Sequence, residues 1–105
     1  MIVIVSDLAQ TQIDQIADYL AIEFGEKSKE KFMDKVNQTL ELLGINPYIG
    51  PQEPLLSDLS KEYHSIVVAK KNKAVYRVIE GIVNVIAFWD CRRDPQKLVK
   101  IIQHI

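Results

Sequence analysis

The 105-residue sequence has little cysteine, glycine, proline or tryptophan: one Cys, four Gly, four Pro and one Trp. The single cysteine, Cys91, excludes a disulfide within the chain and a zinc site made of four thiolates. No apolar run approaches the roughly 20 residues of a membrane-spanning helix, and the apolar start at Met1–Val5 lacks the basic residues of a secretion signal. We therefore expect a small cytoplasmic protein, a single domain over residues 1–105 that needs no metal or cofactor and has no contact with a membrane.

An excess of either charge is also missing, because 13 Lys and Arg nearly balance 14 Asp and Glu, giving a net charge of −1. This balance argues against general nucleic-acid binding. The charge is unevenly divided, however: residues 1–60 carry a net −6 and residues 61–105 a net +5. The asymmetry predicts two faces with different partners, one of them suited to an anion, unless the surface charge divides unevenly by chance.

The first half of the chain predicts a strand followed by two helices. Residues 1–5 are apolar and mostly β-branched, which is typical of a short strand. Ser6-Asp7 offers an N-cap, and apolar residues then recur at helical spacing until Gly25, which is expected to end the helix. A second apolar stripe predicts a helix over about 27–43, ended by Gly44 and Pro47. Helices joined by so few residues form an antiparallel hairpin, and residues 45–60 are expected to be a loop.

The second half has the pattern of strands. Residues 63–70, 74–79 and 82–90 are rich in β-branched and aromatic residues, with expected turns at Lys71-Asn72 and Glu80-Gly81. Asp94-Pro95 then predicts the start of a closing helix with an apolar side formed by Leu98, Ile101, Ile102 and Ile105. The order predicts an α+β fold: an N-terminal strand, an antiparallel helical hairpin packed on one face of an antiparallel β-sheet, and a short C-terminal helix.

Strand parity predicts which residues share a face of the sheet. If Glu80-Gly81 is the loop, Arg77 lies opposite Asn84. The face expected to meet the helices then holds Ala74, Tyr76, Val78, Val83, Val85, Ala87 and Trp89. The opposite, mixed face holds Val75, Arg77, Ile79, Ile82, Asn84, Ile86, Phe88 and Asp90. With Lys71-Asn72 as the other loop, His64, Ile66 and Val68 join the mixed face. A register slip of one residue would separate these groups.

The ordered set of motifs resembles the RelE/ParE-type toxins of type II toxin–antitoxin pairs, often called plasmid stabilisation proteins. The matching segments cover nearly the whole chain: Ile13, Ile16 and Tyr19-Leu20 running into Phe24-Gly25; Leu42-Leu43 with Asn46-Pro47-Tyr48-Ile49-Gly50; Val75-Tyr76-Arg77-Val78; and Asp90-Cys91-Arg92-Arg93-Asp94-Pro95-Gln96-Lys97-Leu98. The resemblance implies a cytoplasmic bacterial toxin held inactive by a cognate antitoxin that wraps a disordered segment over it. Exposed aliphatic residues on the mixed face would suit such a segment.

Two targets follow from the resemblance. RelE-like members cleave messenger RNA in the ribosome without a metal, whereas ParE-like members inhibit DNA gyrase and are not known as nucleases. A third reading is an inactive toxin that retains only antitoxin binding. Whether the chain forms a homodimer or a hetero-oligomer with its antitoxin stays open.

Metal-free RNA cleavage needs an acid, a base and cations around one phosphate. His64 is the candidate acid–base group and Arg77 the phosphate clamp, with Arg92 and Arg93 adding charge where the last strand ends. Three lysines near a turn are candidates for holding RNA backbone: Lys70, Lys71 and Lys73.

Each candidate also has a structural alternative. His64 could be a partly buried or surface histidine of a strand. Arg77 could be a structural arginine paired with Asp90 or with the C-terminal end of a neighbouring helix. The lysines could simply solubilise a turn, while Arg92 and Arg93 could bind an acidic antitoxin.

The sequence also departs from the nuclease pattern in three ways. Its overall balance is acidic, Tyr63-His64-Ser65 stands where many members have an arginine, and the tyrosine or histidine that nuclease members use near the chain end has no clear counterpart. The long helical hairpin favours the ParE-like side.

Overall fold

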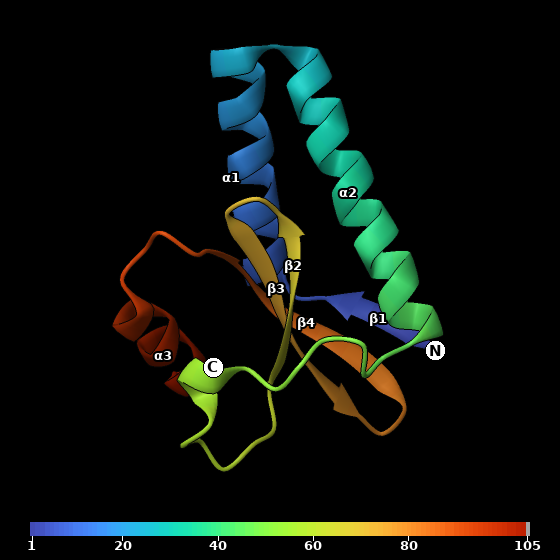
Figure 1. Cartoon of the computed structure of the whole chain (residues 1–105), viewed down its shortest axis with the longest axis vertical. Helices are drawn as coiled ribbons and strands as arrows, with labels where there is room; N and C mark the ends of the chain where they lie inside the picture. Colours follow the sequence, from blue (N-terminus) through green and yellow to red (C-terminus); the bar gives the residue numbers. More distant parts are fainter. Residues whose placement is uncertain (105) are drawn as a thin grey trace.

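Three α-helices and four strands follow one another in the predicted order in the computed structural model, which describes residues 1–104. The elements are β1 (Ile2–Val5), α1 (Asp7–Phe24), α2 (Glu26–Ile45), the short 3-10 helix η1 (Pro54–Leu56), β2 (His64–Ala69), β3 (Asn72–Ile79), β4 (Ile82–Asp90) and α3 (Pro95–Gln103). They confirm the α+β fold (Figure 1). Ile105, expected on the apolar side of the closing helix, lies outside the described residues. Within residues 1–104, no helix is long and apolar enough to cross a membrane.

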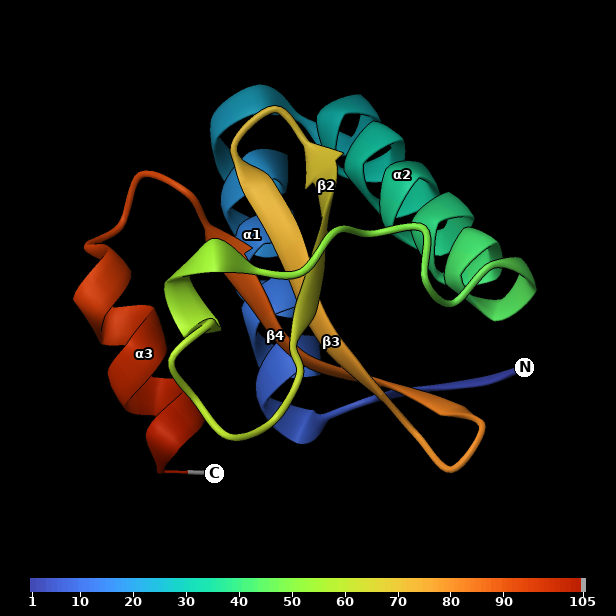
Figure 2. The same ribbon diagram turned by 60° about the horizontal axis from the view of Figure 1, so that its bottom comes forward.

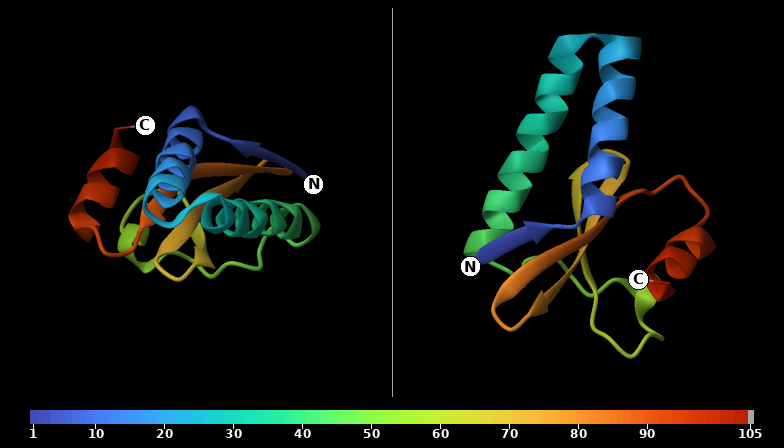
Figure 3. Two further views of the ribbon diagram at one scale, coloured as in Figure 1. Left: turned by 90° about the horizontal axis from the view of Figure 1, so that it is seen from above. Right: turned by 180° about the vertical axis from the view of Figure 1, so that it is seen from behind.

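The strands form one sheet in the order β1-β4-β3-β2. β4 pairs in parallel with β1 and antiparallel with β3, and β3 pairs antiparallel with β2, so the sheet is mixed at one edge. The α1–α2 hairpin packs on one face, and α3 lies on the other side of the sheet (Figures 2 and 3).

Both ends of helix α1 follow their sequence signals. Ser6 is the N-cap, and its Oγ accepts a hydrogen bond of 3.0 Å from the Ala9 N–H, one of the N–H groups without a partner inside the helix. Gly25, with a φ of 93°, separates α1 from α2. A glycine adopts this backbone conformation without strain, so the chain can reverse within one residue and form the predicted hairpin.

The predicted end of the second helix is wrong. Gly44 lies inside α2 and has no left-handed φ. It is instead a point of close approach: the Met1 amino group donates to the Gly44 carbonyl at 2.8 Å, and a Cβ at Gly44 would lie 3.2 Å from the Met1 carbonyl oxygen. The absence of a side chain at Gly44 lets β1 lie against α2, which ends one residue later at Ile45.

A β-bulge in β4 changes the predicted faces of the sheet. Pairing follows the expected register from Ile79–Ile82 through Arg77–Asn84 to Tyr76–Val85, and then shifts so that Val75 pairs with Ala87. Ile86 is the extra residue. Beyond it, parity reverses: Phe88 packs with the hairpin, whereas Ala87 and Trp89 face the other side, the reverse of the prediction.

The bulge therefore produces two apolar clusters, one on each face. The hairpin face buries Ala9, Ile13, Ala17, Phe32, Val36 and Leu43 against Ala74, Tyr76, Val83, Val85 and Phe88. The opposite face buries Val75, Ala87 and Trp89 against Leu56, Tyr63, Leu98 and Ile102. Helix α3 and η1 thus have a core of their own.

The hairpin between β2 and β3 is also shifted from its prediction. Its turn is Lys70-Lys71 rather than Lys71-Asn72, and the pairing skips Val68 between Val67 and Ala69. His64 therefore pairs with Tyr76 and lies on the hairpin face. The predicted grouping of His64 with Arg77 on the mixed face is wrong, because adjacent residues of a strand point to opposite faces.

We predict that Gln12→Leu lowers the free energy of unfolding by about 1–3 kcal/mol, since Gln12 Oε1 accepts a buried hydrogen bond of 2.7 Å from the Phe88 N–H beside the bulge. The matched control is Gln15→Leu, an exposed position on the same helix, which should change stability by less than about 0.5 kcal/mol. Urea denaturation measures both. Equal effects of the two variants would show that the buried hydrogen bond does not stabilise the fold.

Candidate functional site

His64 is held by the loop between α2 and β2. The residue is 8% exposed, its Nδ1 donates to the Gly50 carbonyl at 2.9 Å, and its ring stacks on Tyr76 with 5.6 Å between centroids. The Tyr76 hydroxyl in turn accepts from the Gly50 N–H at 2.9 Å. A Cβ on Gly50 would lie 2.5 Å from the Ser65 carbonyl oxygen, so only glycine fits there. Burial raises the pKa of Tyr76, which outweighs the lowering effect of the Gly50 N–H.

The second nitrogen of His64 has little room to act on a substrate. Nε2 is buried, makes no hydrogen bond, and lies 3.3 Å from Glu62 Oε1. The Tyr48 ring contacts the imidazole edge-on, at 5.8 Å between centroids. These contacts favour a structural role for His64, the alternative weighed from the sequence.

Arg77 lies on the opposite face of the sheet from His64. Its guanidinium is 5.5 Å from the centre of the Tyr63 ring, which belongs to the apolar cluster beneath α3, and its buried Nε has no hydrogen-bond partner. The expected alternative pairing with Asp90 does not form, because the Asp90 carboxylate binds Arg92. The candidate acid–base group and the candidate phosphate clamp therefore point to opposite faces of the sheet.

Arg92 and Arg93 lie in the segment that follows β4. Arg92 holds Asp90 through two hydrogen bonds, Nε to Oδ1 at 3.1 Å and Nη2 to Oδ2 at 2.8 Å. These bonds from Arg92 lower the pKa of Asp90 and outweigh the effect of burial. Asp90 likewise raises the pKa of Arg92. Arg93 places its guanidinium 4.4 Å from the centre of the Trp89 ring, a cation–π contact.

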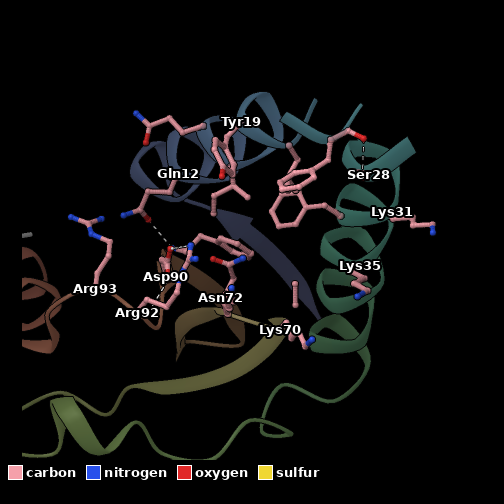
Figure 4. Close-up of a pocket in the computed structure, with 18 residues that line it drawn as sticks. Gln12, Tyr19, Ser28, Lys31, Lys35, Lys70, Asn72, Asp90, Arg92 and Arg93 are labelled. Atoms are coloured by element: carbon pink, nitrogen blue, oxygen red, sulfur yellow. Dashed lines mark hydrogen bonds and ion pairs between the residues drawn. The ribbon is translucent and has the colours of Figure 1, made fainter. Parts of the chain in front are cut away.

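A basic pocket brings four of the predicted residues together. It has a volume of about 690 Å³ and opens between the upper part of the helical hairpin, the β2–β3 turn and the end of β4 (Figure 4). Six cations line it: Lys31 and Lys35 from α2, Lys70 and Lys71 from the turn, and Arg92 and Arg93. Its apolar lining includes Tyr19, Leu20, Phe24, Phe32 and Phe88.

The electrostatics of the basic pocket differ from those of the whole chain. Among residues 1–104, Asp90 is the only acid that lines it, and Arg92 neutralises this carboxylate. Since Arg92 is paired with Asp90 and Arg93 stacks on Trp89, the positive charge at the rim comes mainly from Lys31, Lys35, Lys70 and Lys71, which is a local excess in a chain with a net charge of −1. The predicted anion-binding face therefore has a physical counterpart, although Lys31 and Lys35 come from the acidic half of the chain.

Lys73, the third predicted lysine, has a different position. Its Nζ lies 2.7 Å from Glu53 Oε1, and both side chains are largely buried, with 15% and 3% of their surfaces exposed. Ser65 Oγ donates to the other oxygen of Glu53. Burial raises the pKa of Glu53, but the hydrogen bonds from Lys73 and Ser65 and the Lys73 charge outweigh it and hold the pKa below the ordinary 4.5.

Sequence reasoning missed Glu53, Lys31 and Lys35. Glu53 stands in a proline-rich loop, where no periodicity marks a buried carboxylate. Lys31 and Lys35 do carry a signal: they are four residues apart and directly precede Phe32 and Val36 of the apolar stripe, so they border the buried side of α2.

The fold has a counterpart among solved structures. The structure is similar to a chain in the structure of the chromosomal ParDE TA system from P. aeruginosa, with a TM-score of 0.70, covering 86% of this chain and 95% of that one. The two sequences are 15% identical, so this likeness concerns the fold.

The sequence itself identifies the family. Residues 3–95 match the family model described as the ParE toxin of the type II toxin–antitoxin system parDE. This chain belongs to that family, which confirms the resemblance to RelE/ParE-type toxins and makes an antitoxin its class of partner. No curated protein matches the sequence.

We predict that Glu53 makes stability depend on acid pH. Its pKa is lowered by folding, so its contribution is complete above pH 4.5 and is lost as the pH falls through the lower pKa of the folded state. Glu53→Gln should therefore be less stable than the wild type at pH 7, and the difference should shrink at pH 3.

Urea denaturation at the two pH values measures this, and Asp58→Asn, an exposed carboxylate of the same loop, serves as the control. A difference between Glu53→Gln and the wild type that stays constant with pH would show that the ionised carboxylate is not what stabilises the loop.

Proposed function

We propose that this chain inhibits bacterial growth by binding DNA gyrase in the cytoplasm, without cutting RNA. The observation that supports this most strongly is the separation of His64 from Arg77 on opposite faces of the sheet. Metal-free cleavage needs proton transfer and charge stabilisation at one phosphate. Inhibition by binding makes no such demand, and gyrase is the target that resemblance to ParE implies.

The basic pocket supports a role in neutralisation by the antitoxin. Its cationic rim is complementary to acidic side chains, and its floor of Tyr19, Phe24 and Phe32 can bury apolar ones. An acidic, amphipathic segment of an antitoxin fits both features. The exposed Ile2 and Ile4 of β1 offer a further aliphatic surface that the sequence did not indicate; of the residues expected on the mixed face, Ile79 is 38% exposed.

RNA cleavage at the ribosome remains the second candidate because of one observation. The basic pocket brings Lys70, Lys71, Arg92 and Arg93 together, and these residues could hold a phosphate backbone. The pocket lining contains no histidine, so this candidate lacks the predicted acid–base group there.

Incorporation of labelled thymidine and methionine, followed for minutes after the chain is expressed without its antitoxin, tests the proposed target. We expect thymidine uptake to fall first, since gyrase inhibition stops replication before translation. Earlier loss of methionine uptake would instead support cleavage of messenger RNA. If neither uptake falls, the chain is an inactive toxin.

Arg77→Ala provides a second test of the binding mechanism. We expect this variant to remain as toxic as the wild type, provided that circular dichroism shows it folded, because inhibition by binding needs no phosphate clamp and the Arg77 guanidinium packs over the Tyr63 ring. Loss of toxicity in a folded Arg77→Ala protein would restore the phosphate-clamp role.

Charge reversal tests the role of the basic pocket. Lys70→Glu with Lys71→Glu should weaken antitoxin binding by about tenfold to a hundredfold, equivalent to roughly 1.4–2.8 kcal/mol, and make binding less sensitive to salt. Lys97→Glu with Lys100→Glu, on exposed positions of α3 outside the pocket, is the matched control. Calorimetry measures both; equal affinities of the two double variants would place the antitoxin elsewhere.

A further inference from the structure

The helical hairpin extends beyond the part of it that packs on the sheet. Ala17 is the last buried residue of α1, and Phe32 is the first buried residue of α2. Residues 18–31 between them, the hairpin tip, contain no buried residue. Seven residues at the end of α1 correspond to about 10 Å of helix at 1.5 Å per residue. Figures 1 and 3 show this tip projecting from the rest of the molecule.

The tip makes few contacts that offset the conformational entropy lost when its residues are ordered. Short helices without tertiary packing are marginal in water. Within the tip, the Tyr19 and Phe24 rings meet edge to face at 6.3 Å, and Ser28 Oγ donates to the Phe24 carbonyl at 3.4 Å. These local contacts hold the end of the hairpin, but they bury none of its larger side chains.

Three large apolar side chains of the tip face solvent. Tyr19 is 56% exposed, Ile22 is 81% exposed and Phe24 is 65% exposed. Single exposed apolar residues are common on protein surfaces, but Tyr19 and Ile22 are three positions apart and so are neighbours on one side of α1, and the Phe24 ring meets the Tyr19 ring edge to face. Tyr19 and Phe24 also line the basic pocket, whereas Ile22 does not.

The charges around these side chains restrict what can bind them. The α1 half of the tip, residues 18–24, carries Asp18 and Glu23 and no cation, whereas the α2 half carries Glu26 and Glu30 together with Lys27, Lys29 and Lys31. Carboxylates repel nucleic-acid phosphates, anionic lipid headgroups and the acidic segment proposed for the basic pocket. The complementary surface is an apolar cleft of a protein, bordered by cations.

We propose that the α1 half of the hairpin tip docks into an apolar, cation-bordered cleft of the protein that this toxin inhibits. The proposal rests on the proposed function, in which the toxin acts by binding gyrase. It also connects inhibition to neutralisation: a segment seated in the basic pocket covers Tyr19 and Phe24, two of the three apolar side chains, and so blocks docking.

Ile22→Glu tests the proposal. Burial of a glutamate in an apolar cleft is unfavourable, so the amount of toxin needed to halve growth, and to halve supercoiling by purified gyrase, should rise at least about tenfold. The fold should not change, because Ile22 is 81% exposed. Antitoxin affinity should also stay within about twofold of the wild type, since Ile22 lies outside the basic pocket.

Ile45→Glu is the matched control. Ile45 is 82% exposed and ends α2, so the same substitution meets the same unfavourable helix C-terminus, but at the opposite end of the hairpin from the tip. We expect this variant to keep full toxicity. Equal toxicity of Ile22→Glu and the wild type, or equal losses in both variants, overturns the proposal.

Three further outcomes separate this inference from the proposed function. Loss of antitoxin affinity in Ile22→Glu overturns the proposal by making the antitoxin the occupant of the tip. A wild-type dimer that Ile22→Glu converts to a monomer in size-exclusion chromatography overturns it in favour of a second copy. If purified gyrase is unaffected by the wild type while Ile22→Glu alone loses toxicity, gyrase is the wrong target and the tip is still the docking surface.

Discussion

The bulge in β4, and the side chains of the α1 N-cap Ser6 and of Gln12 in α1 that hydrogen-bond to its backbone, determine how the rest of the molecule is arranged. Ser6 Oγ donates to the carbonyl of the extra residue, Ile86, at 2.8 Å, and the Ser6 N–H donates to the Val85 carbonyl at 2.9 Å. Further along α1, the Gln12 side chain accepts a hydrogen bond from the Phe88 N–H. A buried backbone group without a partner is costly, so a bulge inside a sheet is stable only where neighbouring groups provide hydrogen bonds. The same serine caps α1, which joins helix formation to the placement of β4.

Because of the bulge, β4 contributes buried side chains to both apolar clusters. Before it, Val83 and Val85 pack beneath the hairpin; after it, Phe88 takes over that role and Trp89 points to the opposite side, where α3 covers it. Phe88 forms part of the floor of the basic pocket, and Trp89 carries the guanidinium of Arg93 on its ring. Without the reversal of parity, the end of β4 would present a tryptophan to the hairpin and a phenylalanine to α3. The position of the pocket is therefore set by backbone geometry more than by the lysines and arginines around it.

The two proposed binding surfaces are adjacent on the helical hairpin, which suits a protein that must be both active and switched off. The basic pocket lies where the hairpin meets the β2–β3 turn, and the tip continues beyond it. Tyr19 and Phe24 belong to both. Because the pocket rim is cationic and the α1 half of the tip is acidic, each surface favours a different partner, while the shared aromatic side chains make the two partners compete.

The sequence alone determined the elements, their order and the family: the apolar periodicities, Gly25 and Asp94-Pro95 predict the helices and strands, and the ordered motifs identify a RelE/ParE-type toxin. It also pointed to Arg92, Arg93, Lys70 and Lys71, which the structure gathers in one pocket. Only the tertiary structure decided which residues share a face. A bulge of one residue leaves hydrophobicity unchanged but reverses every side chain beyond it, so the irregularities at Val68 and Ile86 moved His64 and exchanged Phe88 with Trp89. The sequence also could not identify Glu53 as buried. Its partners Ser65 and Lys73 lie on β2 and β3, and only the folded chain brings them into contact with the Glu53 carboxylate.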